Sequence, residues 1–211
     1  MTEPDAPSAT GVRRRRAKRG EGARLREELL AAARQLLDER GESAVTVRAV
    51  AQRVGVSTPA VYLHFASRTE LLHGVCRGVW DRLDAYMAEA AAAAEDPFEE
   101  LRRRCAAYIR FGLDHPLHYG LVAAGPATEA TAQVADACFR ELHGAVRRCL
   151  DASLLEGDGI ALTRAVCACL HGAVSLLLLQ SPAVWPRDLE RYAEDVAAVA
   201  CAGARHHADL P

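Results

Sequence analysis

Residues 46–72 read TVRAVAQRVGVSTPAVYLHFASRTELL, and this stretch decides the fold of the N-terminal part of the chain. Thr46 is a residue type that caps helices, and the apolar residues behind it recur at helical spacing, so a short helix is expected over 47–54. Those apolar residues are Val47, Val50, Ala51 and Val54. Gly55 permits a tight turn, and a second short helix is expected over about 58–64. This pattern predicts a helix-turn-helix, whose second helix enters the major groove of DNA.

The flanking sequence supplies helices on both sides of this motif. A first helix is expected over about 23–40, with Gly41 as its C-terminal cap. Its apolar face comprises Leu25, Leu29, Ala33, Leu36 and Leu37. Ser67-Arg68-Thr69-Glu70 has the form of a capping box and predicts the start of a long helix that reaches about residue 94. A helical DNA-binding domain over 23–73 follows from this order.

The remaining chain also favours helices. Alanine is abundant, aromatic residues make up 5% of the chain, and apolar and polar residues do not alternate as they do in strands. Proline, glycine and capping residues divide the sequence into expected helices over 97–114, 117–124, 128–155, 159–180 and 187–205. We therefore expect an all-α protein of about nine helices, with a larger helical domain over 74–211 that binds a ligand and dimerises.

Charge is distributed unevenly along the chain. Residues 1–72 contain 13 basic and 9 acidic side chains, whereas the whole chain has a net charge of −2. Residues 1–22 are rich in arginine, proline and glycine, and we expect them to be disordered. This segment is interpreted either as a solvated tail or as a basic arm that lies on phosphates or enters a neighbouring minor groove.

The motif in 46–72 resembles the DNA-binding domain of the TetR family. The shared features are a threonine that opens the second helix, the turn Gly55-Val56-Ser57, the ending Tyr62-Leu63-His64-Phe65, and Arg68 before Glu70-Leu71-Leu72. The resemblance implies a homodimeric transcriptional regulator that binds a double-stranded, palindromic DNA operator. It further implies a repressor released by a small-molecule effector, with activation as the less common alternative.

Carried over by position, the resemblance implies a set of DNA contacts. The candidate DNA-binding residues are Thr46, Arg48, Ser57, Thr58, Pro59, Ala60, Tyr62, His64 and Arg68. The alternative for Tyr62 and His64 is packing that holds the turn together, and the alternative for Arg48 and Arg68 is a solvated charge. Phe65 is interpreted as a core residue.

Downstream of residue 73 the resemblance is to the regulatory domain of this family. HYGL at 118–121 and LHGAVSL at 170–176 are similar to the WHG-type subgroup, although Leu170 replaces its tryptophan. The candidate effector-binding residues are Trp80, Met87, Tyr108, Phe111, His118, Tyr119, Phe139, His143 and His171. Aromatic rings mixed with histidines favour an apolar or aromatic effector with a few polar groups, although a residue of this kind taken alone is more often core than pocket.

The last two expected helices carry the dimerisation hypothesis. Leu189, Ala193, Val196 and Ala200 repeat at the spacing of a helix-packing seam. The apolar run 165–179 is short for a membrane span and needs cover on both sides, so we expect a partner subunit rather than a membrane. The alternative is a core helix of a monomer.

Several other classes of protein are disfavoured by the sequence. It contains no Gly-rich phosphate loop, nucleophile elbow or metal-binding helix motif, so an enzyme is the weaker hypothesis, and no cofactor or metal is expected. Seven cysteines without zinc-finger spacing favour buried thiols in a reducing cytoplasm. Cys167, Cys169 and His171 leave a metal- or redox-responsive regulator, or one that acts through protein partners, as the alternative.

Overall fold

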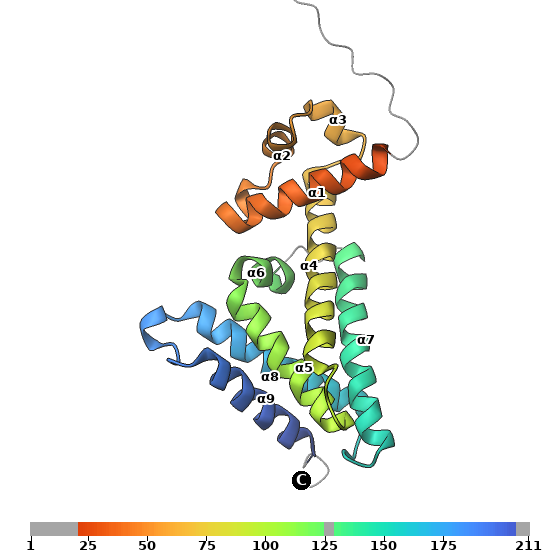
Figure 1. The fold of residues 1–211 in the computed structure, drawn as a ribbon, viewed down its shortest axis with the longest axis vertical. Helices are drawn as coiled ribbons and strands as arrows, with labels where there is room; N and C mark the ends of the chain where they lie inside the picture. Colours follow the sequence, from red (N-terminus) through yellow and green to blue (C-terminus); the bar gives the residue numbers. More distant parts are fainter. Residues whose placement is uncertain (1–20, 125–128, 206–211) are drawn as a thin grey trace, which may run out of the picture.

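The computed structural model describes residues 21–124 and 129–205. The described chain is helical, with a small headpiece at one end and a larger body at the other (Figure 1). The predicted basic arm falls almost wholly on residues 1–20 and, like the predicted break at Gly125-Pro126, lies outside the described residues.

The headpiece comprises α1 (Glu21–Arg40), a short 3₁₀ turn η1 (Glu42–Ala44), α2 (Val47–Val54) and α3 (Thr58–Tyr62). The expected helix starts are confirmed in detail. Thr46 Oγ1 accepts a hydrogen bond from the Ala49 amide, and Gly55 adopts a left-handed φ of 73° in the turn between α2 and α3. Glycine has no Cβ and adopts that φ without steric cost, which explains why the turn is placed there.

A long helix, α4 (Arg68–Ala91), runs from the headpiece down through the body (Figure 1). Ser67 Oγ accepts from the Glu70 amide, and Glu70 reaches back to the Ala66 amide, so the predicted capping box is confirmed. The same helix packs against α1 and against the body helices α5, α6 and α7. It therefore belongs to both halves of the molecule.

The body is built around α5 (Pro97–Asp114), which packs against α4, α7 (Glu129–Asp151), α8 (Gly159–Leu179) and α9 (Leu189–Arg205). The short helix α6 (Pro116–Ala124) lies between the body and α1. Asp96 and Asp158 cap α5 and α8, as their positions before each helix predicted. A short 3₁₀ turn, η2 (Pro182–Val184), interrupts the loop before α9.

Close packing of α5 against α8 depends on Gly112. A Cβ built at this position would lie 2.7 Å from Val174 Cγ1 and 3.1 Å from the Tyr119 ring. Ion pairs of Arg102 and Arg110 with Glu194 hold the opposite side of α5 against α9. The central helix is thus fixed against α8 on one side and against α9 on another.

Candidate nucleic-acid interface and ligand cavity

The inner face of the helix-turn-helix is wholly apolar. Val50 of α2, Val61 of α3 and Phe65 are fully buried in one cluster with α1 and α4, which confirms Phe65 as core. The Arg26 guanidinium of α1 lies 5.0 Å from the centre of the Phe65 ring. Burial on this scale fixes the angle between α2 and α3, so the outward side chains of α3 have defined positions.

The outer face of α3 carries most of the candidate DNA-binding residues. Ser57, Pro59 and Tyr62 are exposed, whereas Thr58, Ala60 and His64 are half-buried. Ser57 precedes the helix without making a side-chain cap, so its hydroxyl is available to another partner. Tyr62 is 52% exposed and Leu63 is 85% exposed, which makes Leu63 an outward residue that the sequence reasoning missed.

The basic side chains of the headpiece fall into two kinds. Arg53 forms a two-pronged ion pair with Glu39, with N–O distances of 2.7 and 2.6 Å. Arg68 donates to the backbone oxygens of Val45 and Glu42, each at 2.8 Å, and thus supports the loop before α2. Within the described residues Arg48 is exposed and has no acidic partner. Its charge is therefore available for a phosphate.

The body contains a cavity of about 350 Å³ framed by α4, α5, α6, α7 and α8. Five of the predicted effector-binding residues line it: Trp80, Met87, Tyr108, Phe139 and His171. The other lining residues are Arg104, Ala123, Ala135, Asp136, Cys138, Leu142, Cys167 and Leu170. Most of these lie three or four positions from a predicted residue on the same helix, a spacing that could have revealed them.

A polar network borders this cavity. The Tyr108 hydroxyl lies 3.2 Å from His171 Nδ1, and the Tyr119 hydroxyl lies 2.8 Å from the same nitrogen and 3.1 Å from Ser175 Oγ. Burial lowers the pKa of His171 and raises the pKa of Tyr108, so both groups are neutral near pH 7. The network therefore offers neutral hydrogen-bonding groups beside apolar walls.

The other predicted effector-binding residues lie away from the cavity wall. Phe111 is buried against Tyr86 and His115, and His143 bonds Thr163 Oγ1 at 3.1 Å. Tyr119 does not line the cavity but contacts two residues that do, His171 and Tyr108. His118 faces α1 instead of the cavity. The structure thus places Phe111, His118 and His143 outside this cavity wall, because aromatic and histidine content does not reveal which side of a helix is turned inward.

His118 connects the body to the headpiece. Its Nε2 lies 2.6 Å from Asp38 Oδ1 of α1, and the imidazole is 2% exposed. Burial lowers the pKa of His118, and the nearby Arg82 and Arg34 act in the same direction, while Asp38 opposes them. The neighbouring residue on α6, Tyr119, bonds His171 of the cavity network. One short helix thus touches both the headpiece and the cavity border.

The cysteines of the body are free thiols. Cys105 and Cys201 are buried with their sulfurs 4.0 Å apart, and burial raises the pKa of Cys149 to about 11. Cys167 lines the cavity, whereas Cys169 is exposed on the outer side of α8. Among the described residues no group of three or more His, Cys, Asp or Glu side chains is arranged to hold a metal ion.

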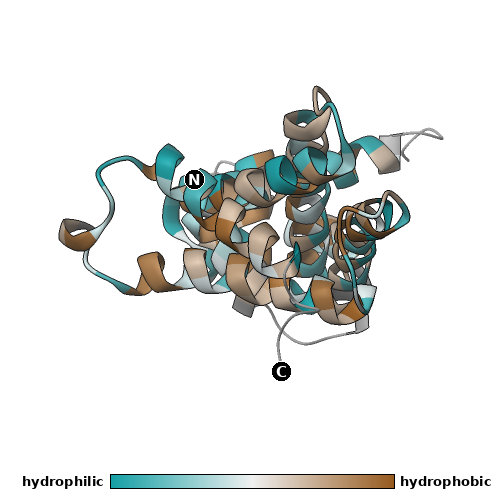
Figure 2. Cartoon of the chain, turned by 90° about the horizontal axis from the view of Figure 1, so that it is seen from below, coloured by the Kyte–Doolittle hydropathy of each residue, from teal (hydrophilic) through white to brown (hydrophobic). Residues whose placement is uncertain are grey.

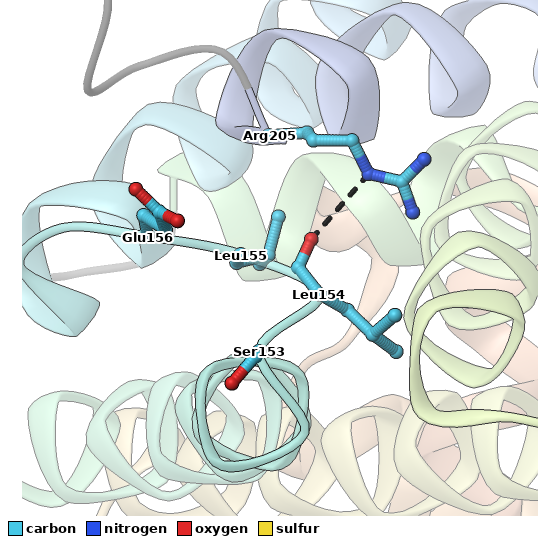
Figure 3. A pocket seen from close by; sticks show the side chains of 5 residues that line it. All are labelled: Ser153, Leu154, Leu155, Glu156 and Arg205. Carbon is cyan, nitrogen blue, oxygen red and sulfur yellow. Dashed lines mark hydrogen bonds between the residues drawn. The ribbon is translucent and has the colours of Figure 1, made fainter.

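A second hollow, of about 370 Å³, lies where the chain reverses after α7 (Figure 3). It is lined by Ser153, Leu154, Leu155, Glu156 and Arg205. Arg205 Nε donates to the Leu154 carbonyl at 3.4 Å, and its guanidinium lies 3.9 Å from the centre of the Phe98 ring. The arginine is thus committed to holding α9 against the loop, and the hollow is a surface feature of that turn.

The outer sides of α8 and α9 carry exposed apolar residues. Leu176 is 59%, Leu179 85% and Val199 72% exposed, and Gly172 and Gly203 have no neighbour within 4 Å of a built Cβ. The seam predicted from the sequence is wrong in its direction: Ala193 and Ala200 are buried, and Leu189 and Val196 pack against the core of their own subunit. The exposed stripe on α9 is instead centred on Val199.

Helix α8 is long and apolar enough to cross a membrane by length and composition. A core helix passes the same test, and 39% of its apolar window is buried inside the protein. Its polar residues include Ser175 and His171, which belong to the cavity network. In the view from below, the loop that joins α8 to α9 projects furthest from the body (Figure 2).

Comparisons with known proteins cover both parts of the chain. Residues 29–75 match the family described as bacterial regulatory proteins, tetR family, and residues 101–200 match the tetracyclin repressor-like C-terminal domain. The transcriptional repressor KstR2 of Mycobacterium tuberculosis is 36% identical over 77 residues, which cover 36% of this chain and 38% of KstR2. The transcriptional activator FasR of Mycolicibacterium smegmatis is 34% identical over 86 residues, covering 41% of this chain and 39% of FasR.

The sequence matches thus span about two fifths of the length of these curated relatives. The similarity in fold covers more of the chain than the sequence matches do. The structure of RolR in complex with resorcinol superposes with a TM-score of 0.66 at 19% identity, over 90% of this chain and 96% of RolR. Two family matches, one to the headpiece and one to the body, together span most of the described residues. The chain therefore belongs to the TetR family of bacterial regulatory proteins, whose members bind DNA through a helix-turn-helix.

Proposed function

We propose that this protein is a sequence-specific transcriptional repressor that acts as a homodimer and is released from a palindromic operator by a small, largely apolar or aromatic effector. Residues 23–73 form its DNA-binding domain, and residues 74–211 form its effector-binding and dimerisation domain. Residues 1–22 supply a basic arm. The protein works in the cytoplasm on double-stranded DNA and catalyses no reaction.

The observation that carries the proposal is the outer face of α3. Tyr62 at the end of α3 and Leu63 just after it are exposed, whereas the neighbouring Val61 and Phe65 are fully buried. The exposed side chains of Tyr62 and Leu63 are therefore available to base edges and phosphates. Arg48, exposed at the start of α2 and without an ion pair among the described residues, adds a charge for the backbone.

The homodimer is supported by the exposed stripe of α8 and α9. Large apolar side chains that stay exposed on adjacent helices mark a contact surface, and the two glycines on these helices allow close approach. A twofold axis there would place two copies of α3 on one side of the dimer. They would meet half-sites about one helical turn, or roughly 34 Å, apart.

Release by an effector is supported by the cavity between the body helices. Its volume of about 350 Å³ lies within the range of small-molecule sites. RolR, which shares the fold, binds the aromatic diol resorcinol. KstR2 is a repressor and FasR is an activator. We propose that this protein represses transcription, and activation is the alternative.

A mobility-shift assay tests the proposal. The purified protein is titrated onto DNA from the region upstream of its own gene, alongside the variants Arg48→Ala and Tyr62→Ala. We expect a specific shift for the wild type. For each variant we expect an apparent Kd raised about ten-fold, the effect of losing about 1.4 kcal/mol.

Arg147→Ala is the matched control, because Arg147 is an exposed arginine on α7, far along the chain from the headpiece. We expect its affinity to stay within two-fold of the wild type. Where the upstream region is not the operator, the wild type is used to select bound fragments from a genomic library. A wild-type protein that selects no sequence contradicts the proposal, and equal binding by Arg48→Ala and Tyr62→Ala contradicts the assigned contacts.

A further inference from the structure

The chemistry of the cavity in the body restricts the ligand that it can take. Its walls are aromatic and aliphatic, with Trp80 and Met87 from α4, Phe139 and Leu142 from α7, and Leu170 from α8. Apolar walls of this kind exclude water and favour flat or branched hydrocarbon surfaces. A ligand without a sizeable apolar part would leave these side chains without partners.

The charged side chains of the wall are either paired or exposed, and Asp136 of α7 is the exposed one. Arg104 and Asp136 are the ionisable side chains with a fixed charge that line the cavity. Arg104 is already paired with Glu100 at 2.9 Å, and Glu100 also accepts from Arg148. A ligand carboxylate would have to compete with Glu100 for Arg104, and burying an unpaired charge is costly. The cavity is therefore suited to a neutral molecule.

The polar groups are concentrated at one border. His171 stands between the hydroxyls of Tyr108 and Tyr119, and Tyr119 also contacts Ser175. Because the imidazole is neutral near pH 7, it has one donor and one acceptor nitrogen, and each hydroxyl can either donate or accept. A ligand hydroxyl can join this network in either sense, whereas a carboxylate can only accept and an ammonium can only donate.

We propose that this cavity binds a neutral, hydroxylated aromatic molecule, with the ring between Trp80, Met87 and Phe139 and the hydroxyl bonded to His171 and Tyr108. This inference rests on the proposed function, because it names the class of effector for that site. A chain of contacts also joins the border of the cavity to the headpiece. Tyr119, which bonds His171, is next along α6 to His118, which contacts Asp38 of α1.

One alternative class of ligand is a cation. Asp84 of α4 has a buried carboxylate oxygen without a hydrogen-bond partner, and this carboxylate acts on the pKa of the lining residue Cys138. An ammonium group could satisfy that oxygen. Asp84 itself does not line the cavity, so we favour a neutral ligand over a cationic one. The experiment below includes a cationic probe that distinguishes the two.

The test uses four probes that share one naphthalene ring and differ in a single substituent. They are 2-naphthol, naphthalene, 2-naphthoate and 2-naphthylmethylamine, which present a hydroxyl, no polar group, an anion and a cation at pH 7. Each is titrated into the full-length protein without DNA by isothermal titration calorimetry, up to about 0.2 mM. We expect 2-naphthol to bind at least about ten-fold more tightly than each of the other three, as expected where one hydroxyl completes a network.

Two variants locate the recognition. Tyr108→Phe and His171→Leu are expected to weaken 2-naphthol about five- to ten-fold while changing naphthalene less than about two-fold, since only the hydroxyl loses its partner. Tyr86→Phe is the matched control, because this tyrosine of α4 packs on Phe111 outside the cavity wall. Circular dichroism of each variant checks that its helices are intact.

The results separate this inference from the proposed function. Tightest binding of 2-naphthoate or of 2-naphthylmethylamine overturns the neutral class, and equal binding of 2-naphthol and naphthalene overturns the role of the hydroxyl network. Binding of none of the four probes overturns the ligand class itself. Because the titration needs no DNA, a protein that prefers 2-naphthol and still fails the mobility shift would disprove the regulator and leave the cavity assignment standing.

Discussion

The headpiece and the body bury different kinds of side chain, although they share α4. In the headpiece, fully buried residues such as Val50, Val61 and Phe65 are apolar, and polar side chains face outward or cap helix ends. In the body, His118 and Thr163 are buried as well, and a polar network borders the cavity. A rigid, apolar headpiece can present one fixed surface to DNA, whereas a body with polar groups inside can recognise a ligand and respond to it.

The largest effect is expected where the headpiece core is broken. Phe65→Ala removes a fully buried ring that joins α3 to α1 and α4, and it should lower the free energy of unfolding by about 3–5 kcal/mol. Urea denaturation followed by circular dichroism measures the change. We expect the headpiece to melt before the body. Leu63→Ala is the control, because Leu63 is 85% exposed, and it should change stability by less than about 0.5 kcal/mol.

A single cooperative transition in Phe65→Ala, with the body unfolding together with the headpiece, would show that the two regions are one thermodynamic unit. In that case the shared helix α4 transmits the loss of the headpiece core to the body.

The second effect concerns the exposed stripe of the body. Val199→Asp places a carboxylate in the middle of the exposed apolar surface of α9. It should raise the dissociation constant of the proposed dimer by about a hundred-fold, because burying an unpaired charge even in part is unfavourable. Size-exclusion chromatography with light scattering measures the oligomeric state. Leu63→Asp introduces the same charge on an exposed leucine of the headpiece and should leave the dimer intact. Unchanged association in Val199→Asp would place the dimer contact elsewhere.

The same contrast explains what the sequence could predict. The structure of the headpiece could be predicted because its signals are local. Thr46 caps α2 by accepting a hydrogen bond from the amide three residues later, and Gly55 marks a turn by its own left-handed conformation. The helix order of the body was predictable for the same reason, from proline and aspartate at helix starts.

The cavity was less predictable because it is assembled from five helices. Trp80 and His171 are 91 positions apart in the chain yet line one space. Their identity suggested a ligand site, but the rotation of each helix decides which neighbours join them. His143 and His118 are of the same type as His171 and point to Thr163 and Asp38 instead. The seam on α9 was misassigned for the same reason, since an apolar stripe does not say whether its own subunit or a partner covers it.

The third effect tests the contact between the two regions. His118 meets Asp38 and Arg34 from α1, Arg82 from α4 and the neighbouring His115, and burial keeps the folded pKa below the unfolded value of about 6.5. The unfolded state then binds the proton more readily, so stability falls as pH is lowered through about 6.5 towards the folded pKa. The contribution of one such group is at most about 1.4 kcal/mol per pH unit.

Urea denaturation between about pH 7 and pH 5.5 should therefore show a shallower loss of stability in His118→Gln than in the wild type. His171→Gln is the parallel variant within the body, because burial lowers the pKa of His171 in the same direction. Identical slopes in His118→Gln and the wild type would mean that the contact with Asp38 compensates for burial. A gain of wild-type stability relative to His118→Gln as the pH is lowered would instead mean that Asp38 raises the pKa of His118 and that a protonated histidine holds the headpiece to the body.

The smallest effect is confined to the turn of the headpiece. Gly55→Ala should cost about 1 kcal/mol, because φ at this position is 73° and an alanine avoids that region. A Cβ at Gly55 would have no neighbour within 4 Å, so crowding adds nothing and the cost is purely conformational. Gly55→Asn provides the matched comparison, since asparagine tolerates the left-handed region, and it should cost less than Gly55→Ala. Thermal unfolding of the two variants measures the difference, and an equal loss in both would show that the side chain disturbs the surface of the turn and not its backbone.

Gly55 also lies in the turn that joins α2 to α3. A reduction in DNA affinity larger than the loss of stability would therefore show that DNA binding depends on the angle between the two helices and not only on their folding.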